Sequence, residues 1–407
     1  MRLDYTFMQA KKRRILVWLV VVALLAFSLL VPASAKDPTS AVSTQSSRAA
    51  APESFEREVL GLRIEFVAAS HAYRLVQPAS GERNNSHVVL SSGTLEECEE
   101  RLLEVLRDRY GTGHVNVPIF TTGGLQFWGD VFVFQGWRIQ KHVFAGHYRL
   151  LDGNSVRRAW GEYEGCRVAF EEQRVELKLK RKSDHLVLLV HGLGRSRHSF
   201  SSMHESLVAE GYEVSSVGYP STRRSLAEHV AQLTGVLERT DGIRQVSFVT
   251  HSLGGIVVRK LLSTPGSWQD SIALHSVVML APPNRGSVLA EVLEDWVPFQ
   301  VIAGDVGQEL TPAALVTLPE PSCSFGIIAG GTGKEYGYNP VLKGDNDGVV
   351  LVANTRLPGA NDFLRLNASH SFIMHKQQVI DATLRFLRTG RFAESDDQTS
   401  ISPADGQ

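Results

Sequence analysis

The chain has 407 residues, which is enough for two domains with a substantial buried core. Its 42 Lys and Arg residues balance 43 Asp and Glu residues, for a formal net charge of -1, so charge gives no basis for nucleic acid as a partner. With 43% hydrophobic and 21% charged residues, the composition is that of a folded globular protein rather than a disordered one.

A basic and then apolar segment opens the chain. The tetrad Lys11-Lys12-Arg13-Arg14 precedes the uncharged run Ile15–Val31, a pattern typical of an export signal. We therefore expect residues 1–35 to direct the protein out of the cytoplasm, with the membrane as a partner of this segment. Cleavage after Ala35 would release a secreted or periplasmic protein. The run is close to the length that spans a bilayer, which favours a retained anchor. Residues 36–54, rich in Ser, Ala, Thr and Pro, are predicted to be a flexible linker.

Residues 55–182 form the first predicted folded region, a small α+β extension. Thr94 followed by glutamates predicts a helix that begins there and runs to Arg109. The segments 130–144 and 166–180 are expected to be strands. We find no chemical motif in this region, and the sequence does not indicate its role.

Three cysteines occur, at positions 98, 166 and 323, and none belongs to a CxxC or to a His/Cys cluster with zinc spacing. The sequence therefore predicts no metal site. A disulfide between Cys98 and Cys166 is possible outside the cytoplasm, which would leave Cys323 as a free thiol. The interpretation we favour is that all three are packing residues.

From residue 183 the pattern changes to apolar strands alternating with helices, which predicts a mostly parallel sheet with helices on both faces. Helices are expected from about Phe200, over 226–239, from Leu253 and over 376–388, and residues 393–407 are expected to be a disordered tail. Sites in such sheets lie at the carboxyl ends of the strands. The predicted strands are carried by segments 185–192, 212–220, 245–252, 274–280, 323–331 and 362–369.

One serine lies on a sharp corner between a predicted strand and a helix, in Thr250-His251-Ser252-Leu253-Gly254-Gly255. Such a turn lifts the Ser252 hydroxyl clear of the sheet and leaves the Leu253 N–H at a helix N-terminus, where it can stabilise an oxyanion. Thr250 stands where the G-x-S-x-G pattern has glycine, which makes the geometry of the turn less certain. The alternative is that Ser252 only caps the helix.

A second glycine-rich turn, His191-Gly192-Leu193-Gly194, ends the first predicted parallel strand. Its glycines allow a close approach to the serine, and the backbone N–H of Leu193 is the candidate second oxyanion donor. We expect His191 to shape this loop rather than to act as a base.

An acid and a base should follow the serine in the order Ser, Asp, His. Asp347, in a tight turn with Gly348, is preferred over Asp345, which is expected to be a surface turn residue. A calcium loop is the competing interpretation of these two aspartates, but the remaining ligand spacing is missing. His370, directly after the last predicted strand, is preferred as the base over His375, which lies beside the final helix.

The region 183–392 resembles the α/β-hydrolase superfamily in its lipase and esterase branch, among bacterial lipase-like serine hydrolases. The resemblance implies Ser252 as nucleophile, Asp347 as acid and His370 as base, with the amides of Leu193 and Leu253 as the oxyanion hole and no cofactor. The matching segments are HGLG (191–194), GYPSTRRSLAEHVAQL (218–233), THSLGG (250–255), MLAPPNRGSVLAEVL (279–293), NDGVV (346–350) and ASHSFIM (368–374).

The expected activity is hydrolysis of carboxylic esters, with a small-molecule or lipid ester as substrate. Between Ser287 and Ser322 lies an insertion with apolar residues such as Trp296 and Phe299, which would form either an apolar lid over the serine or a cover for the core. Two alternatives remain open. One is an acyltransferase that uses the same triad, and the other is a membrane-tethered binding protein without catalysis.

Overall fold

The computed structural model describes residues 56–78, 87–111, 116, 118–121, 126–286, 315 and 317–393. The predicted export segment, the linker, the C-terminal tail and most of the apolar insertion lie outside these residues. None of the helices in the described ranges is long and apolar enough to cross a membrane. The chain divides into two compact units, Met1–Gly111 and Thr112–Gln407, and this division falls inside the region 55–182 that we treated as one extension.

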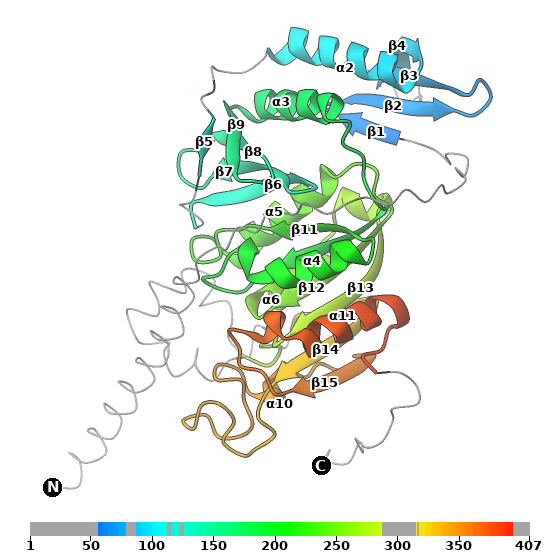
Figure 1. The fold of residues 1–407 in the computed structure, drawn as a ribbon. Coiled ribbons are helices and arrows are strands. Elements are labelled where there is room, and N and C mark those ends of the chain that lie inside the picture. The colour runs from blue at the N-terminus through cyan, green and yellow to red at the C-terminus, as the bar shows by residue number, and fades with distance from the viewer. Residues whose placement is uncertain are drawn as a thin grey trace, which may run out of the picture. The chain divides into compact units, whose positions relative to one another are not determined.

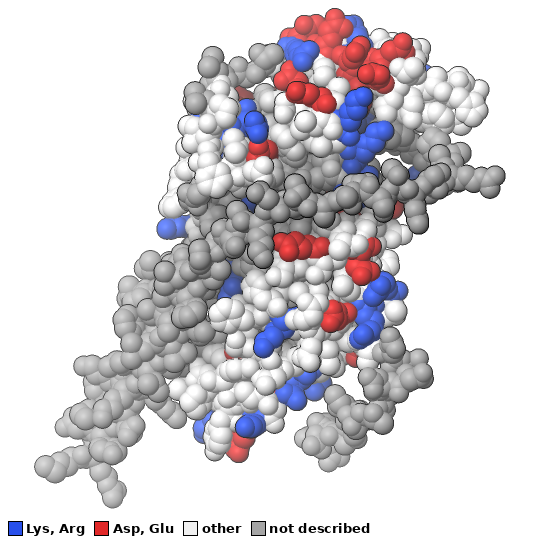
Figure 2. All heavy atoms as spheres, in the orientation of Figure 1, with Lys and Arg blue, Asp and Glu red and all other residues white. Residues whose placement is uncertain are grey.

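In the first unit, residues 56–78 and 87–111 form an antiparallel sheet and a helix. The helix α2 (Leu95–Tyr110) begins at Thr94, whose hydroxyl accepts the Glu97 N–H while the Glu97 carboxylate accepts the Thr94 N–H, so the predicted helix start is confirmed. Acidic residues gather over this helix (Figure 2). The strands, in sheet order, are β1 (Glu56–Val59), β2 (Leu62–Val67), β3 (Ala72–Pro78) and β4 (His87–Gly93).

The second unit begins with another antiparallel sheet, in the order β5-β9-β8-β7-β6, covered on one face by α3 (Tyr163–Glu176). The segment 166–180, which we predicted to be a strand, is therefore mostly helix. Cys166 and Phe170 lie four residues apart and pack together against this sheet, which is the spacing of a helix face. The strands are β5 (Ile119–Phe120), β6 (Trp128–Phe134), β7 (Trp137–His142), β8 (Tyr148–Leu151) and β9 (Val156–Gly161).

The predicted parallel sheet is confirmed, with six strands in the order β11-β10-β12-β13-β14-β15 (Figure 1). Its strands are β10 (His185–Val190), β11 (Glu213–Val217), β12 (Gln245–His251), β13 (Ala273–Leu280), β14 (Ser324–Gly330) and β15 (Asp362–Leu366). The accompanying helices are η1 (Arg197–Phe200), α4 (Ser201–Ala209), α5 (Leu226–Glu238), α6 (Leu253–Leu262), η2 (Ser267–Asp270), α10 (Val352–Thr355), η3 (Ile373–His375) and α11 (Gln377–Thr389).

The strands of this sheet are apolar on both sides because helices cover both faces. In β10, Leu186, Leu188 and Val190 pack in the core formed with α5 and α6, whereas Val187 and Leu189 pack in the core formed with α4 and α11. The strand β10 lies between β11 and β12, so the chain order reverses beside it. The segments that follow β10 and β12 therefore meet at the carboxyl edge of the sheet, where sites occur in sheets of this kind.

The antiparallel sheet of the second unit is attached at this same edge. The N–H of Asp130 in β6 donates to the carbonyl of Gly218, which directly follows β11, at 2.8 Å, and the Gly218 N–H donates to the Asp130 carboxylate at 2.6 Å. The side-chain amide of Gln232 in α5 donates to the backbone carbonyls of Asp130 and Gly218, at 2.8 and 3.0 Å. Residues before β10 thus contact the carboxyl edge of the parallel sheet directly.

Candidate active site

Ser252 lies at the corner between β12 and α6 in an unusual backbone conformation. Its φ of 51° and ψ of -122° are values that residues with a side chain rarely adopt. The Ser252 N–H donates to the carbonyl of Leu280 at 2.9 Å, which ties the corner to the end of β13. The turn is possible because its neighbours are glycines: a Cβ on Gly192 would lie 3.1 Å from the Ser252 Cβ, and one on Gly254 would lie 2.3 Å from the Val190 carbonyl oxygen.

Thr250, the departure from the glycine pattern, is fully buried and fits the turn. Its hydroxyl lies 3.4 Å from the carbonyl oxygen of Val278 on the neighbouring strand. The side chain occupies space that Gly255 leaves open, because a Cβ on Gly255 would lie 3.3 Å from the Thr250 hydroxyl oxygen. The second glycine after the serine therefore accommodates the threonine before it.

The structure brings Ser252, His370 and Asp347 together in one hydrogen-bonded chain. The Ser252 hydroxyl lies 3.0 Å from His370 Nε2, and His370 Nδ1 lies 2.7 Å from a carboxylate oxygen of Asp347. Since an ionised carboxylate only accepts, Nδ1 carries the proton and Nε2 is left to accept from the serine. The second carboxylate oxygen accepts the N–H groups of Val349 and Val350 at 2.9 and 2.7 Å, which fixes the orientation of the acid.

The loop that carries His370 is held from two sides. The His370 N–H donates to the Asp347 carbonyl at 2.8 Å, and the ring of His251 donates from Nε2 to the His370 carbonyl at 3.0 Å. Burial, with further contributions from the neighbouring His370 and Arg195, holds the pKa of His251 well below its usual value. His251 is therefore neutral at pH 7, with the proton on Nε2, and its hydrogen bond helps to hold the segment that carries His370.

The candidate oxyanion donors lie just after β10 and β12, Leu193 in the loop that follows β10 and Leu253 at the start of α6. Within the described part of the chain, the N–H groups of Leu193 and Leu253 have no hydrogen-bond acceptor, so both are available to a ligand. The neighbouring Gly194 N–H is already used, since it donates to the Ser221 hydroxyl at 3.0 Å. The Tyr219 hydroxyl donates to the His191 carbonyl in the same loop. We did not identify Tyr219 and Ser221 from the sequence, although both lie in the GYPS segment that contributes to the family resemblance.

His191 shapes this loop, as we expected from its place at the end of the predicted strand. Its Nδ1 donates to the Gly192 carbonyl at 2.9 Å, and its ring stacks on Tyr219 with the centroids 4.3 Å apart. Burial lowers its pKa to about 4, so it is neutral at pH 7.

Asp345 and His375, the neighbours that we did not choose, lie outside this hydrogen-bonded chain. Asp345 is a turn residue, as expected, and its carboxylate also accepts the N–H groups of Thr332 and Gly333 at 2.8 and 2.9 Å, which holds the turn after β14. His375 is exposed at the end of η3. Among the described residues, no group of three or more metal-ligating side chains comes together.

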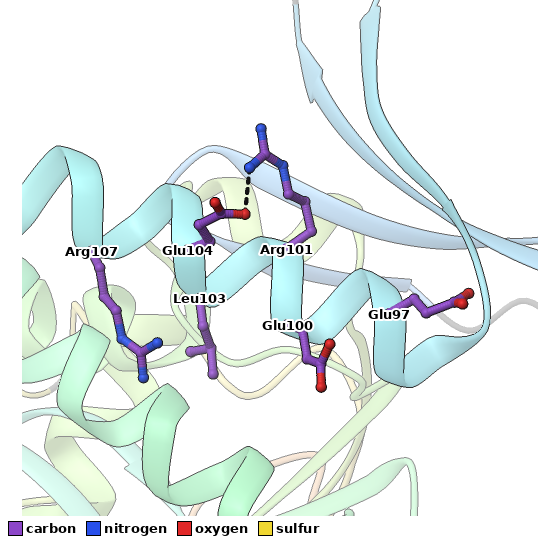
Figure 3. Close-up of a pocket in the computed structure, with 6 residues that line it drawn as sticks. All are labelled: Glu97, Glu100, Arg101, Leu103, Glu104 and Arg107. Carbon is purple, nitrogen blue, oxygen red and sulfur yellow. Dashed lines mark hydrogen bonds and ion pairs between the residues drawn. The ribbon is translucent and has the colours of Figure 1, made fainter.

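A shallow hollow along α2 in the first unit offers no comparable chemistry (Figure 3). Its lining includes an ion pair between Arg101 and Glu104 and contains neither a histidine nor a serine or cysteine. The lining residues are Glu97, Glu100, Arg101, Leu103, Glu104 and Arg107.

The parallel sheet, the strained serine between β12 and α6, and the acid and base after the later strands are the defining features of the α/β-hydrolase fold as it occurs in lipases and esterases. The chain has this fold, preceded by antiparallel sheets. The family described as "Domain of unknown function (DUF7379)" matches residues 158–314. No curated protein matches the chain.

Solved structures that resemble the chain include three ester-cleaving enzymes. Mature Bacillus licheniformis lipase BlEst2 is 19% identical, with a TM-score of 0.41, over 50% of this chain and 91% of that one. The metagenomic carboxyl esterase MGS0156 is 19% identical, with a TM-score of 0.36, over 47% and 65%. Phospholipase PlaB from Legionella pneumophila is 19% identical, with a TM-score of 0.35, over 42% and 45%. At such identities the likeness concerns the fold alone.

Proposed function

We propose that the protein hydrolyses carboxylic esters, with lipid or other acyl esters as the substrate class, through an acyl-enzyme on Ser252. The observation that carries this proposal is the unbroken hydrogen-bonded chain from Ser252 through His370 to Asp347. A serine hydroxyl becomes a useful nucleophile only when a positioned base takes its proton, and this arrangement supplies that base.

In the proposed reaction, His370 Nε2 takes the hydroxyl proton while Ser252 attacks the ester carbonyl. The negative charge that develops on the carbonyl oxygen is stabilised by the N–H groups of Leu193 and Leu253. Asp347 keeps the ring in the correct tautomer and stabilises the imidazolium. His370 then gives its proton to the leaving alcohol, and water, activated by the same base, releases the acid and regenerates the serine.

Labelling with a fluorophosphonate probe tests the assignment directly. We expect stoichiometric labelling of the wild-type protein, no labelling of Ser252→Ala and full labelling of Ser263→Ala, an exposed serine at the other end of the same helix. Mass spectrometry should locate the adduct in the peptide with Ser252. Labelling that persists in Ser252→Ala would contradict the assignment of the nucleophile.

Product analysis with p-nitrophenyl esters and phospholipids then separates the possible reactions. Free acid is the expected product, whereas transfer of the acyl group to an added alcohol in preference to water would indicate an acyltransferase. A folded protein that neither labels nor turns over any ester would favour the non-catalytic binding protein.

We further propose that the site works outside the cytoplasm, with the predicted segment 1–35 as a membrane anchor. The protein should then stay in the membrane fraction after a carbonate wash, with residues 1–35 present in its mass. A soluble protein beginning at Lys36 would indicate cleavage. Protection from protease in spheroplasts would contradict export in either form.

A further inference from the structure

The antiparallel sheet of the second unit presents one face that is only partly covered. On one face, side chains of the sheet pack beneath α3 in a hydrophobic core. On the opposite face, Asp130 bonds to Gly218 just after β11, and Val133 packs in the core of the parallel sheet. Farther along this opposite face, around the turn between β7 and β8, a group of rings lies at the surface. We call this group the aromatic patch, and it consists of Phe127, Trp128, His142, Phe144, His147 and Trp160.

The patch is continuous. Phe127 lies 6.0 Å from Phe144 and 6.4 Å from His142, measured between ring centroids. His142 stacks on His147 at 5.2 Å, and His147 lies 6.5 Å from Trp160. The exposed fractions are 69% for Phe144, 40% for Trp160 and 37% for Phe127. Connected aromatic surface of this kind is uncommon on a monomeric protein and marks an interaction site.

The surroundings of the patch are basic. Arg149 lies over the Trp128 ring at 3.9 Å, and Arg223 lies over the Phe127 ring at 5.3 Å. Residues 126–161 contain five Lys and Arg residues and two aspartates. Both aspartates are buried, Asp130 at 0% and Asp152 at 5% exposure. Arg138 is buried and Arg158 pairs with Asp152 at 2.7 Å, so the cations that lie over rings of the patch are Arg149, Arg157 and Arg223.

The patch is also tied to the loops of the candidate active site. Gln126, next to Phe127, donates from Nε2 to the Arg195 carbonyl at 3.0 Å, just after the loop that contains Leu193. Its Oε1 accepts the N–H and hydroxyl of Thr222 at 3.1 and 2.9 Å. A partner bound to the patch would thus lie beside the loops after β10 and β11.

We propose that the aromatic patch docks on the surface of an anionic lipid bilayer. Aromatic rings are favoured at the level of the lipid headgroups, and arginines beside them are attracted to anionic headgroups, so the two features of the patch match one surface. This contact is separate from the predicted anchor at 1–35, and it would hold the candidate site against the lipid. If the proposed function is correct, the bilayer is then the place where the enzyme meets its ester.

Quenching of tryptophan fluorescence by brominated lipids tests the docking without relying on catalysis. Full-length protein in the Ser252→Ala background is added to vesicles of brominated phosphatidylglycerol or of brominated phosphatidylcholine alone. The difference between this protein and the same protein with Trp160→Phe isolates the signal of Trp160, because the other five tryptophans, Trp18 in the apolar segment and Trp128 in the patch among them, are common to both. Trp268→Phe, which removes a side chain with 2% exposure, is the matched control.

We expect Trp160 to be quenched in the phosphatidylglycerol vesicles and several-fold less in phosphatidylcholine or at high salt, where headgroup attraction is lost. Phe144→Ser, a change at an exposed position that should leave folding intact, should reduce the Trp160 signal. Equal quenching with and without Trp160 in anionic vesicles would overturn the proposal. So would a Trp160 signal that changes with protein concentration and not with lipid, because the face would then belong to a second copy of the chain.

Discussion

Replacing Gly254 with alanine tests whether the close approach of α6 to β10 builds the candidate site. The added Cβ would lie 2.3 Å from the carbonyl oxygen of Val190 and 2.8 Å from that of His191. Both contacts are with backbone, so the strand end and the loop after it must move. Overpacking of this kind costs about 1–3 kcal/mol, and the better helix propensity of alanine returns up to about 1 kcal/mol. We expect a net loss of about 1–2 kcal/mol in the free energy of unfolding.

The same shift should impair catalysis, because the displaced His191 carbonyl lies two residues before the Leu193 N–H. Removal of one oxyanion donor costs about 10²–10³ in kcat, so its misplacement should cost at least about tenfold. Urea unfolding and ester turnover measure the two effects. Gly153→Ala is the control, since a Cβ there has no atom within 4 Å. The reasoning is refuted if Gly254→Ala matches Gly153→Ala in both stability and kcat.

The remaining predictions concern the acid, the oxyanion loop and pH. Asp347→Asn should lower kcat by about 10⁴-fold, because His370 Nδ1 would lose the carboxylate oxygen that accepts its proton. Asp345→Asn should instead lower the free energy of unfolding by about 1 kcal/mol and have a much smaller effect on kcat. The opposite ranking in steady-state kinetics would mean that the wrong aspartate was chosen. Ser221→Ala should lower kcat by about tenfold with little change in KM, because the Gly194 N–H would lose its acceptor and the loop that presents the Leu193 N–H would be held less firmly. A change in KM alone would contradict this prediction. The free energy of unfolding should fall as the pH drops below about 6.5, because a buried histidine with a depressed pKa takes up a proton in the unfolded state but not in the folded state. Each such histidine should lower it by about 1 kcal/mol between pH 6.5 and 5.5. The effect is expected for His191 and His229, whose pKa values burial lowers to about 4, and for His251, whose pKa burial holds well below its usual value. A flat profile of unfolding free energy over this range would contradict it.

The parallel sheet was predictable because its strands and helices carry strong local patterns. Two predicted strand ends carried Ser252 and His370, and the structure brings these residues together with Asp347, which the sequence placed in a tight turn with Gly348. The carboxyl ends of parallel strands meet at one edge, so residues more than a hundred positions apart could be placed together from the pattern alone.

What the sequence did not predict depends on contacts that leave no periodic pattern. The alternating end of the segment 166–180 favoured a strand, but packing of Cys166 and Phe170 on the antiparallel sheet makes it a helix. Asp345 accepts hydrogen bonds from the backbone amides of Thr332 and Gly333, thirteen and twelve positions earlier, and no spacing rule indicates such contacts. The aromatic patch is assembled from three strands, β6, β7 and β9, and from the loops beside them, so its members are scattered along the chain.

The strained conformation of Ser252 requires rigid, buried neighbours that keep the turn in place. A serine with φ of 51° costs about 1–3 kcal/mol relative to a relaxed turn, and the corner keeps this conformation only if its neighbours cannot yield. The helix α6 supplies that resistance, since Ile256, Val257 and Leu261 are fully buried and the Gly255 N–H donates back to the Ser252 carbonyl at 2.9 Å. Substitutions that loosen α6 against β10 should therefore relax the serine, and reduce its reactivity, at losses of stability too small to unfold the protein.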